Sequence, residues 1–325
     1  MRLMRSISCC SDSGPRYAEL HCTTNFSFLR GGSHPDELVL KAHALGYSAL
    51  AITDHSTLAG IVRAHGAAKQ VGLKLLVGTA VVPVDAAPLV VWATNRTGYS
   101  NLCRLLTGGH AAGHAAGRGT GHGTGHGAGR DGSSDDAAAR CRIGIGDVAA
   151  HADGLLAGVP LARLADAARA GGRSATGAAA ERIQQWREVF GERLHALAEV
   201  ALEGDDEDRL QWCARLAREA RVPIVAAGDV RYHERSRMPL FDVLAAVRAR
   251  CTVEEVRDRL LSNGERHLHD RRRIAERFAR LPGAVERTVE IADRCTFSLD
   301  ELRYEYPDAI VPKDRSPREH LAHLA

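Results

Sequence analysis

The sequence predicts an α/β protein in which short parallel strands alternate with helices, arranged either as a barrel or as an open doubly wound sheet. Two observations support this fold class. From residue 17 onward, apolar runs of strand length alternate with longer stretches that have a helical pattern and often end at glycine. Polar residues, histidine and aspartate among them, directly follow several of these runs. Repeated β-α units of this kind pair their strands in parallel and place the helices outside.

The first part of the chain supplies four strands and three helices. Ser33, Pro35 and Glu37 form a start signal for a helix that runs to about Leu45, where Gly46 ends it. The predicted strands cover residues 17–22, 49–53, 74–82 and 89–93, and the other two helices cover residues 57–71 and 99–106.

A Gly-rich, His-rich insert then breaks this rhythm. Residues 108–130 alternate Gly, Ala and His, including His110, His114, His122 and His126. A segment with so little apolar area to bury predicts a loop or a disordered insert. Metal capture by the spaced histidines is the alternative, and it would cost a flexible chain considerable ordering entropy. The β-α rhythm resumes with helices at 178–190 and 206–221 and strands at 195–202 and 223–227.

The last part of the chain is helical and rich in arginine. Charge runs such as Arg271–Arg273, and the segment 284–294, have acidic residues among them and are typical of solvated helix faces. Ser316 and Glu319 have the residue types of a capping box, with Pro317 at the first helical position, so a short helix should begin there. Such a short helix would be marginal alone, which indicates a sequence that ends within a larger protein.

The composition describes a soluble globular chain. Its 43 Lys and Arg residues against 40 Asp and Glu leave a net charge of +3, too small for nucleic-acid binding through bulk charge alone. Eight scattered cysteines without a C-x-x-C pair are typical of a reduced, cytoplasmic protein. No membrane span is expected, because Pro83, Asp85 and Pro88 interrupt the longest apolar stretch.

Three groups of polar residues lie at the ends of predicted strands and could form a site. They are the segments 19–23, 53–55 and 228–233. Strand ends and the loops after them open onto one face of a β/α fold, so these groups should converge. Imidazole nitrogens and carboxylate oxygens projecting from several strand ends are the ligands expected of a hydrolytic site for a divalent metal.

Several long, ordered motifs resemble one family. The segments 17–29, 45–47 and 49–55 resemble the start of a polymerase-and-histidinol-phosphatase (PHP) domain. More narrowly, the segments 58–65, 98–102, 228–233 and 297–307 are similar to bacterial error-prone DNA polymerases, which are damage-inducible relatives of the replicative polymerase III alpha subunit. The resemblance covers most of residues 16–325, apart from the insert.

The resemblance implies a fold and a division of the chain. The fold is a distorted seven-stranded PHP-type β/α barrel followed by a helical segment. Residues 1–15 form an N-terminal tail, residues 16–240 form the PHP domain with its insert at about 108–137, and residues 241–325 lead toward a polymerase palm that the family places downstream. Within the barrel we expect Leu50, Ile52 and Val77 to face the interior.

The metal-binding positions of the family are only partly retained. His21 and His55 match family histidines, Asp54 precedes His55 as expected, and Asp229 matches the aspartate of a later Asp-x-His pair. Where the family has further ligands or, in the turn after the first strand, an aspartate, this chain has instead Thr23, Arg30, Ala80 and Arg231. A fixed positive charge beside a dication is repulsive. We therefore expect a divalent metal, zinc or manganese, to be weakly bound or absent, in a residual site of His21, His55 and Asp229.

The resemblance leaves three functional hypotheses. The first is the N-terminal PHP module of an error-prone polymerase, with a degenerate metal site and no polymerase active site, whose partners are DNA, downstream polymerase domains and other repair proteins. The second is an autonomous metal-dependent phosphoesterase or 3′-5′ exonuclease, in which Asp54, Glu199 and His233 are further candidate ligands beside the residual site. The third, a histidine-rich metal-binding protein, requires all metal affinity to reside in the insert.

Overall fold

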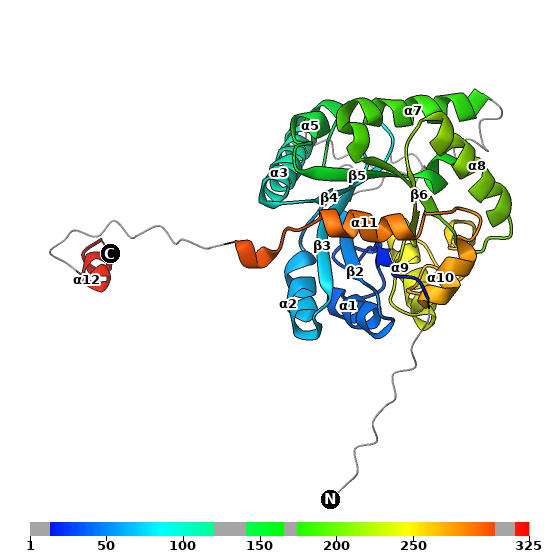
Figure 1. Cartoon of the computed structure of the whole chain (residues 1–325). Helices are drawn as coiled ribbons and strands as arrows, with labels where there is room; N and C mark the ends of the chain where they lie inside the picture. The colour runs from blue at the N-terminus through cyan, green and yellow to red at the C-terminus, as the bar shows by residue number, and fades with distance from the viewer. Residues whose placement is uncertain (1–13, 120–140, 166–173, 303–315, 325) are drawn as a thin grey trace, which may run out of the picture.

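The computed structural model describes residues 14–119, 141–165, 174–302 and 316–324. One seven-stranded sheet forms its centre, and helices surround the sheet (Figure 1). The strands follow one another in the sheet in chain order: β1 (Ala18–Glu19), β2 (Ala49–His55), β3 (Lys74–Val81), β4 (Leu89–Ala93), β5 (Leu155–Pro160), β6 (Leu194–Glu199) and β7 (Ile224–Ala227). The expected count of seven strands is therefore confirmed.

The helices occupy the connections and the last part of the chain. Around the sheet lie α1 (Pro35–Ala44), α2 (Ile61–Val71), α3 (Arg96–Gly119), α5 (Ile145–Ala150), α7 (Ser174–Phe190) and α8 (Asp206–Glu219). After the sheet come α9 (Met238–Ala249), α10 (Arg271–Arg277), α11 (Glu286–Arg294) and α12 (Pro317–Leu324). Gly72 ends α2 in the left-handed conformation, with φ of 72°, as expected for a glycine after a helix. The capping box of α12 is present, because the backbone N–H of Glu319 donates to Ser316 Oγ.

The sheet is nearly closed into a barrel. Beyond β1 and β7, the backbone N–H of Thr23 donates to the carbonyl of Val230 at 2.9 Å, and the N–H of Val230 donates to the carbonyl of His21 at 2.9 Å. One apolar cluster includes side chains from all seven strands and therefore marks the barrel interior. It includes Trp92, whose indole N–H donates to the carbonyl of Leu20.

Strand β4 departs from the expected parallel pairing, because it runs antiparallel to both β3 and β5. The connection from β3 to β4 spans only residues 82–88. A parallel crossover needs about a dozen residues or more, so this connection can only reverse the chain. The six remaining strands point the same way, and their carboxyl ends lie at one end of the barrel.

The expectation that Leu50, Ile52 and Val77 line the barrel interior is wrong. All three belong to the cluster that packs the sheet against α1 and α2. The alternate residues Ala51 and Leu76 face the interior instead. Successive side chains of a strand point to opposite faces, and small Ala side chains suit the narrow interior while the larger ones fill the space under the helices.

Strand β5 is not among the strands expected from the sequence, and its apolar run contains Gly158 and Pro160. The structure gives the reason for Gly158: a Cβ atom there would lie 2.6 Å from the Trp92 ring. The glycine therefore leaves room for an indole that fills the barrel interior. Pro160 is the last residue of the strand, so it does not interrupt the ladder in the middle.

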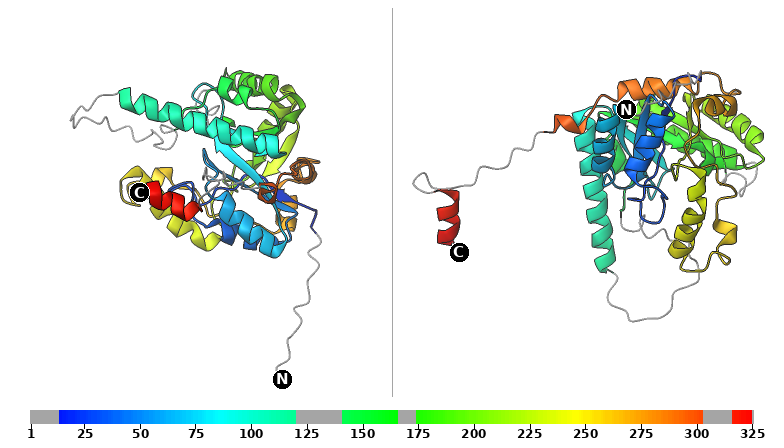
Figure 2. Two further views of the ribbon diagram at one scale, coloured as in Figure 1. Left: turned by 90° about the vertical axis from the view of Figure 1, so that its left-hand side faces the viewer. Right: turned by 90° about the horizontal axis from the view of Figure 1, so that it is seen from below.

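The expectation that the insert is a loop from residue 108 onward is wrong for its first part. Helix α3 continues to Gly119 as one long helix (Figure 2). Gly109 packs so closely against Cys141 and Ile143 that a Cβ atom would lie within 2.8 Å of either side chain. The N–H of Arg142 donates to the Gly109 carbonyl at 2.9 Å. Tertiary contacts thus outweigh the poor helix propensity of glycine. Residues 120–137 of the insert lie outside the described residues.

The chain after residue 240 contributes to the barrel. Helix α11 contacts β1 and β7 (Figure 1), and its residues Ile291 and Ala292 belong to the interior cluster together with Cys295. The backbone N–H of Ala226 in β7 also donates to the carbonyl of Ala284 at 3.0 Å. The core therefore extends past the proposed boundary at residue 240. Among the described residues, the structure has no helix that is long and apolar enough to cross a membrane.

Candidate functional site at the carboxyl ends of the strands

The polar segments that follow the strands converge at the carboxyl end of the barrel. His21 follows β1, Glu199 ends β6 and Asp229 follows β7. Each offers a ligand atom, and these three atoms lie within 4.8 Å of one another. All three side chains are buried. A group of this kind can hold a metal ion. It contains two of the expected ligands, His21 and Asp229, and Glu199, one of the further candidate ligands.

The buried carboxylate of Glu19 fixes the backbone next to this group through hydrogen bonds. Glu19 Oε1 accepts hydrogen bonds from the backbone N–H groups of His21 and Gly228, at 2.9 and 3.0 Å. A Cβ atom at position 228 would lie 2.5 Å from this carboxylate, so only glycine fits there. The next residue, Asp229, has φ of 44°, a conformation that Asp adopts more readily than most residues. Glu19 thus holds the two segments that carry His21 and Asp229.

The imidazole of His21 lies close to both carboxylates of the group, those of Glu199 and Asp229. Its Nδ1 lies 2.7 Å from Glu199 Oε1 and 3.8 Å from Asp229 Oδ1. Its other ring nitrogen, Nε2, is buried and has no hydrogen-bond partner among the described residues. Because a carboxylate can only accept, the His21 Nδ1–H donates to Glu199 in this arrangement.

Two arginines neutralise Asp229. Arg231 Nη2 lies 2.6 Å from Asp229 Oδ1, and Arg266 Nη1 lies 2.6 Å from Asp229 Oδ2. Both guanidinium groups are buried, with each arginine 9% exposed. Burial alone would raise the pKa of Asp229, but Arg231 and then Arg266 overcome this effect and hold the pKa well below its ordinary value. Asp229 is therefore ionised. Its Oδ2 accepts a hydrogen bond from Arg266, and its Oδ1 is ion-paired with Arg231 without a hydrogen bond.

His55 contacts the group through Arg231. Arg231 Nη1 lies 3.3 Å from His55 Nε2 and 3.2 Å from Thr23 Oγ1. Burial, and next the charge of Arg231, lower the pKa of His55 well below its ordinary value. The imidazole is therefore neutral near pH 7. The structure places a guanidinium group between His55 and Asp229, the two residues that we expected to share a metal ion.

Asp54 and His233, two further candidate ligands, have structural partners. Asp54 Oδ1 accepts from the Thr24 N–H at 2.8 Å and from Ser27 Oγ at 2.7 Å, and Asp54 Oδ2 accepts from Thr24 Oγ1 at 2.8 Å. Asp54 therefore holds the turn after residue 24. His233 Nδ1 lies 2.8 Å from Ser33 Oγ, and the group around His21 does not include it.

Sequence reasoning missed Arg266. This residue lies beyond residue 240, in a part of the chain whose arginines we interpreted as solvated. A parallel bridge between Tyr232 and His267 brings its segment to the barrel, and the N–H of Arg231 donates to the Arg266 carbonyl at 2.8 Å. No spacing in the sequence signals this contact.

The residues present do not fit a divalent cation in charge. The donor chemistry is suitable, because one imidazole and two carboxylates are common ligands. However, both guanidinium groups already pair with Asp229, Arg231 also contacts His55, and Glu199 pairs with His21. At about 4 Å and an effective dielectric constant of about 20, one such charge repels a dication by roughly 8 kcal/mol.

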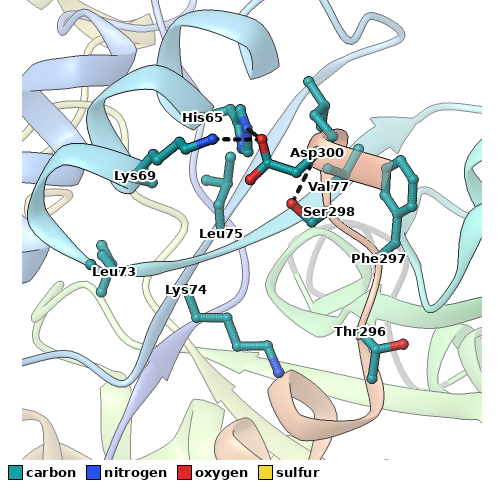
Figure 3. A pocket seen from close by; sticks show the side chains of 13 residues that line it. His65, Lys69, Leu73, Lys74, Leu75, Val77, Thr296, Phe297, Ser298 and Asp300 are labelled. Atoms are coloured by element: carbon teal, nitrogen blue, oxygen red, sulfur yellow. Dashed lines mark hydrogen bonds and ion pairs between the residues drawn. The ribbon is translucent and has the colours of Figure 1, made fainter. Parts of the chain in front are cut away.

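A pocket of about 240 Å³ lies away from this site, between α2, the start of β3 and the segment after α11 (Figure 3). Its rim charges pair with one another: Asp300 Oδ1 lies 2.9 Å from Lys69 Nζ and 3.3 Å from His65 Nε2. Lys74, the first residue of β3, also lines it. The pocket is therefore at the amino end of the barrel, and none of the site residues expected from the sequence lines it.

The fold and the site together define a β/α barrel whose polar side chains meet at the carboxyl ends of its strands, with a His, Glu and Asp group of the metal-binding type. The model of the PHP domain family matches residues 19–198. The chain therefore belongs to the PHP domain family.

The most similar full-length relatives include error-prone DNA polymerases. The chain is 40% identical over 309 residues to the "Error-prone DNA polymerase" of Rhodopirellula baltica, which covers 95% of this chain and 25% of that protein. It is 40% identical over 307 residues to the protein of the same description from Dechloromonas aromatica, covering 94% of this chain and 27% of that protein. The expected homology with these polymerases is confirmed, and the chain spans about a quarter of their length.

The solved structures that it resembles are more distant. A crystal structure from Bifidobacterium adolescentis, described as a putative metal-dependent phosphoesterase, aligns with a TM-score of 0.42 and 18% identity. The alignment covers 66% of this chain and 88% of that one.

Proposed function

We propose that this chain is the PHP module of an error-prone DNA polymerase and that it contributes structure and protein contacts rather than hydrolysis. Its setting is translesion synthesis and DNA repair in the cytoplasm. Its partners are DNA, the downstream polymerase domains that carry the nucleotidyltransferase activity, and other repair-polymerase proteins. Any zinc or manganese ion binds weakly or not at all.

The single observation that carries this proposal is the pairing of both Asp229 oxygens with arginine. A hydrolytic PHP site needs a metal-bound water as its nucleophile. Here the carboxylate that would hold the metal is engaged by two buried guanidinium groups at 2.6 Å. Homology over 95% of the chain supports the polymerase setting.

A chimera tests the structural role. The matching quarter of the Rhodopirellula baltica polymerase is replaced by this chain, and primer extension is compared with that of the intact relative and of the relative lacking that quarter. We expect the chimera to retain DNA synthesis and the truncated protein to lose it, because the module supports the polymerase fold. A truncated protein that extends primers as well as the intact one would contradict the structural role.

A phosphoesterase or 3′-5′ exonuclease remains the second candidate, and the group of His21, Glu199 and Asp229 favours it. Release of phosphate from p-nitrophenyl phosphate and of nucleotides from single-stranded DNA is measured with added Mn²⁺ or Zn²⁺. We expect no release above that of the His21→Ala and His55→Ala variants. Metal-stimulated release that either variant abolishes would establish hydrolysis and overturn our proposal.

A further inference from the structure

We propose that the guanidinium group of Arg231 is the resident cation of this site, and that the acceptors around it bind a divalent ion once that side chain is removed. The inference rests on the proposed function, because it takes the unaltered chain to be free of a tightly held metal ion. It adds a specific role for one residue and a site that is hidden in the unaltered chain.

Arg231 lies among acceptors from three separate segments. Its guanidinium nitrogens lie 2.6 Å from Asp229 Oδ1, 3.3 Å from His55 Nε2 and 3.2 Å from Thr23 Oγ1. These residues follow β7, end β2 and follow β1, respectively. One positive group therefore joins three strand ends, as a coordinated cation would do.

The direction of the hydrogen bond to His55 supports this interpretation. A guanidinium group has only donors, so His55 Nε2 must accept and must direct its lone pair at Arg231. A metal ion takes the same lone pair from a neutral histidine. Asp229 Oδ1 forms an ion pair with Arg231 at 2.6 Å but no hydrogen bond, so it also faces this positive charge. The two groups are thus already oriented as ligands toward a positive charge.

A further possible ligand, His21, lies next to this position, with its Nδ1 3.8 Å from Asp229 Oδ1. Its Nδ1–H donates to Glu199, so its lone pair is on Nε2, which has no hydrogen-bond partner among the described residues. Metal-ligand bonds of about 2.0–2.2 Å are shorter than the contacts that Arg231 makes. Removal of the long side chain therefore leaves both the space and the negative charge that a small dication needs.

Arg266 provides a matched control. It is buried to the same extent as Arg231, with 9% exposure for each, and it pairs with the other oxygen of the same carboxylate at the same 2.6 Å distance. Besides Asp229, Arg266 lies near a second carboxylate, Glu203, at 3.6 Å, whereas Arg231 lies near His55. Replacing either arginine removes one positive charge beside Asp229, but only Arg231 contacts His55.

The experiment compares Arg231→Ala, Arg231→Lys and Arg266→Ala with the parent chain. All carry alanine at His110, His114, His122 and His126, so that the insert adds no metal affinity of its own. Melting temperature and retained metal are measured with and without Zn²⁺ or Mn²⁺. We expect metal to raise the melting temperature of Arg231→Ala by about 4 °C or more, with about one ion retained per chain. Methylguanidinium should compete with that ion.

The other three proteins should gain nothing from the metal. Arg231→Lys keeps the positive charge, and Arg266→Ala leaves the acceptors around Arg231 occupied. Equal metal stabilisation of Arg266→Ala, or none for Arg231→Ala, would overturn the inference. If Arg231→Ala does not fold in plain buffer, refolding with Zn²⁺ or methylguanidinium decides: recovery with either cation supports the inference, and failure with both contradicts it.

The parent chain separates the two proposals. If it already retains tightly bound ions, the proposed function fails together with this inference. If neither the parent nor Arg231→Ala binds an ion, only the inference about Arg231 fails, and the structural role of the module still stands.

Discussion

The two ends of the barrel hold their charges in opposite ways. At the carboxyl end, Asp229 lies between two buried arginines, and its side chain is 12% exposed. At the amino end, Asp300 pairs with Lys69 and His65, but its side chain is 56% exposed (Figure 3). Distances are similar at both ends. Burial, and not distance, therefore decides how much an ion pair contributes to the stability of the fold.

The physical reason is the cost of desolvation. Water stabilises each exposed charge almost as well as its partner does, so surface pairs contribute little. A buried charge has lost that water, and removing its partner leaves the charge uncompensated. The carboxyl end should therefore respond strongly to the loss of one carboxylate, and the amino end hardly at all.

The largest effect is expected for Asp229→Asn. This change keeps the side-chain shape but leaves Arg231 and Arg266 without their shared carboxylate. We expect the free energy of unfolding, measured by urea denaturation at pH 7, to fall by about 3–5 kcal/mol. A loss below about 1 kcal/mol would show that water reaches these arginines, and the contrast between the two ends would then disappear.

The sequence predicted most of the elements but not how they face one another. Apolar runs and helix-stop glycines located six of the seven strands, because those signals are local. Strand β5 was missed, and its Gly158 makes room for Trp92, a packing requirement that the sequence alone does not reveal. The interior face of β2 was misassigned, because both faces of this strand are apolar and only the packing of α1 and α2 decides which face is outside.

The site was predictable to a similar degree. His21 and Asp229 could be named from strand ends, since such ends meet at one face. Glu199 was only a further candidate, and its strand was predicted to continue to residue 202, whereas β6 ends at Glu199. The interposition of Arg231 between Asp229 and His55 depends on side-chain geometry. The contact with Arg266 depends on a bridge between segments far apart in the chain. Neither leaves a local pattern in the sequence.

An intermediate effect is expected from His195, the second residue of β6, near the amino end. Burial lowers its pKa to about 4, against about 6.5 in an unfolded chain. Between these values the unfolded state binds more protons, so stability should decrease as the pH falls from 6.5 to 4. The loss should be roughly 2–3 kcal/mol, measured by urea denaturation across this range.

His195→Gln is the control for this pH dependence. The amide does not titrate, so the variant should lose less stability than the parent between pH 6.5 and 4. Asp229 acts in a different window: its folded pKa is lowered, so its contribution is present above about pH 3.9 and decreases below it. If the parent and the variant had the same pH dependence, the buried neutral state of His195 would be refuted.

The smallest effect is expected for Asp300→Asn, the counterpart of Asp229→Asn at the amino end. The change removes the partner of Lys69 at 2.9 Å, yet both side chains are more than half exposed, and water replaces the lost contact. We expect urea denaturation at pH 7 to give the same midpoint and slope for the variant and the parent, at low and at high salt. A measurable loss at low salt that disappears at high salt would show that this pair does contribute through charge. A loss as large as that of Asp229→Asn would mean that burial is not what distinguishes the two ends.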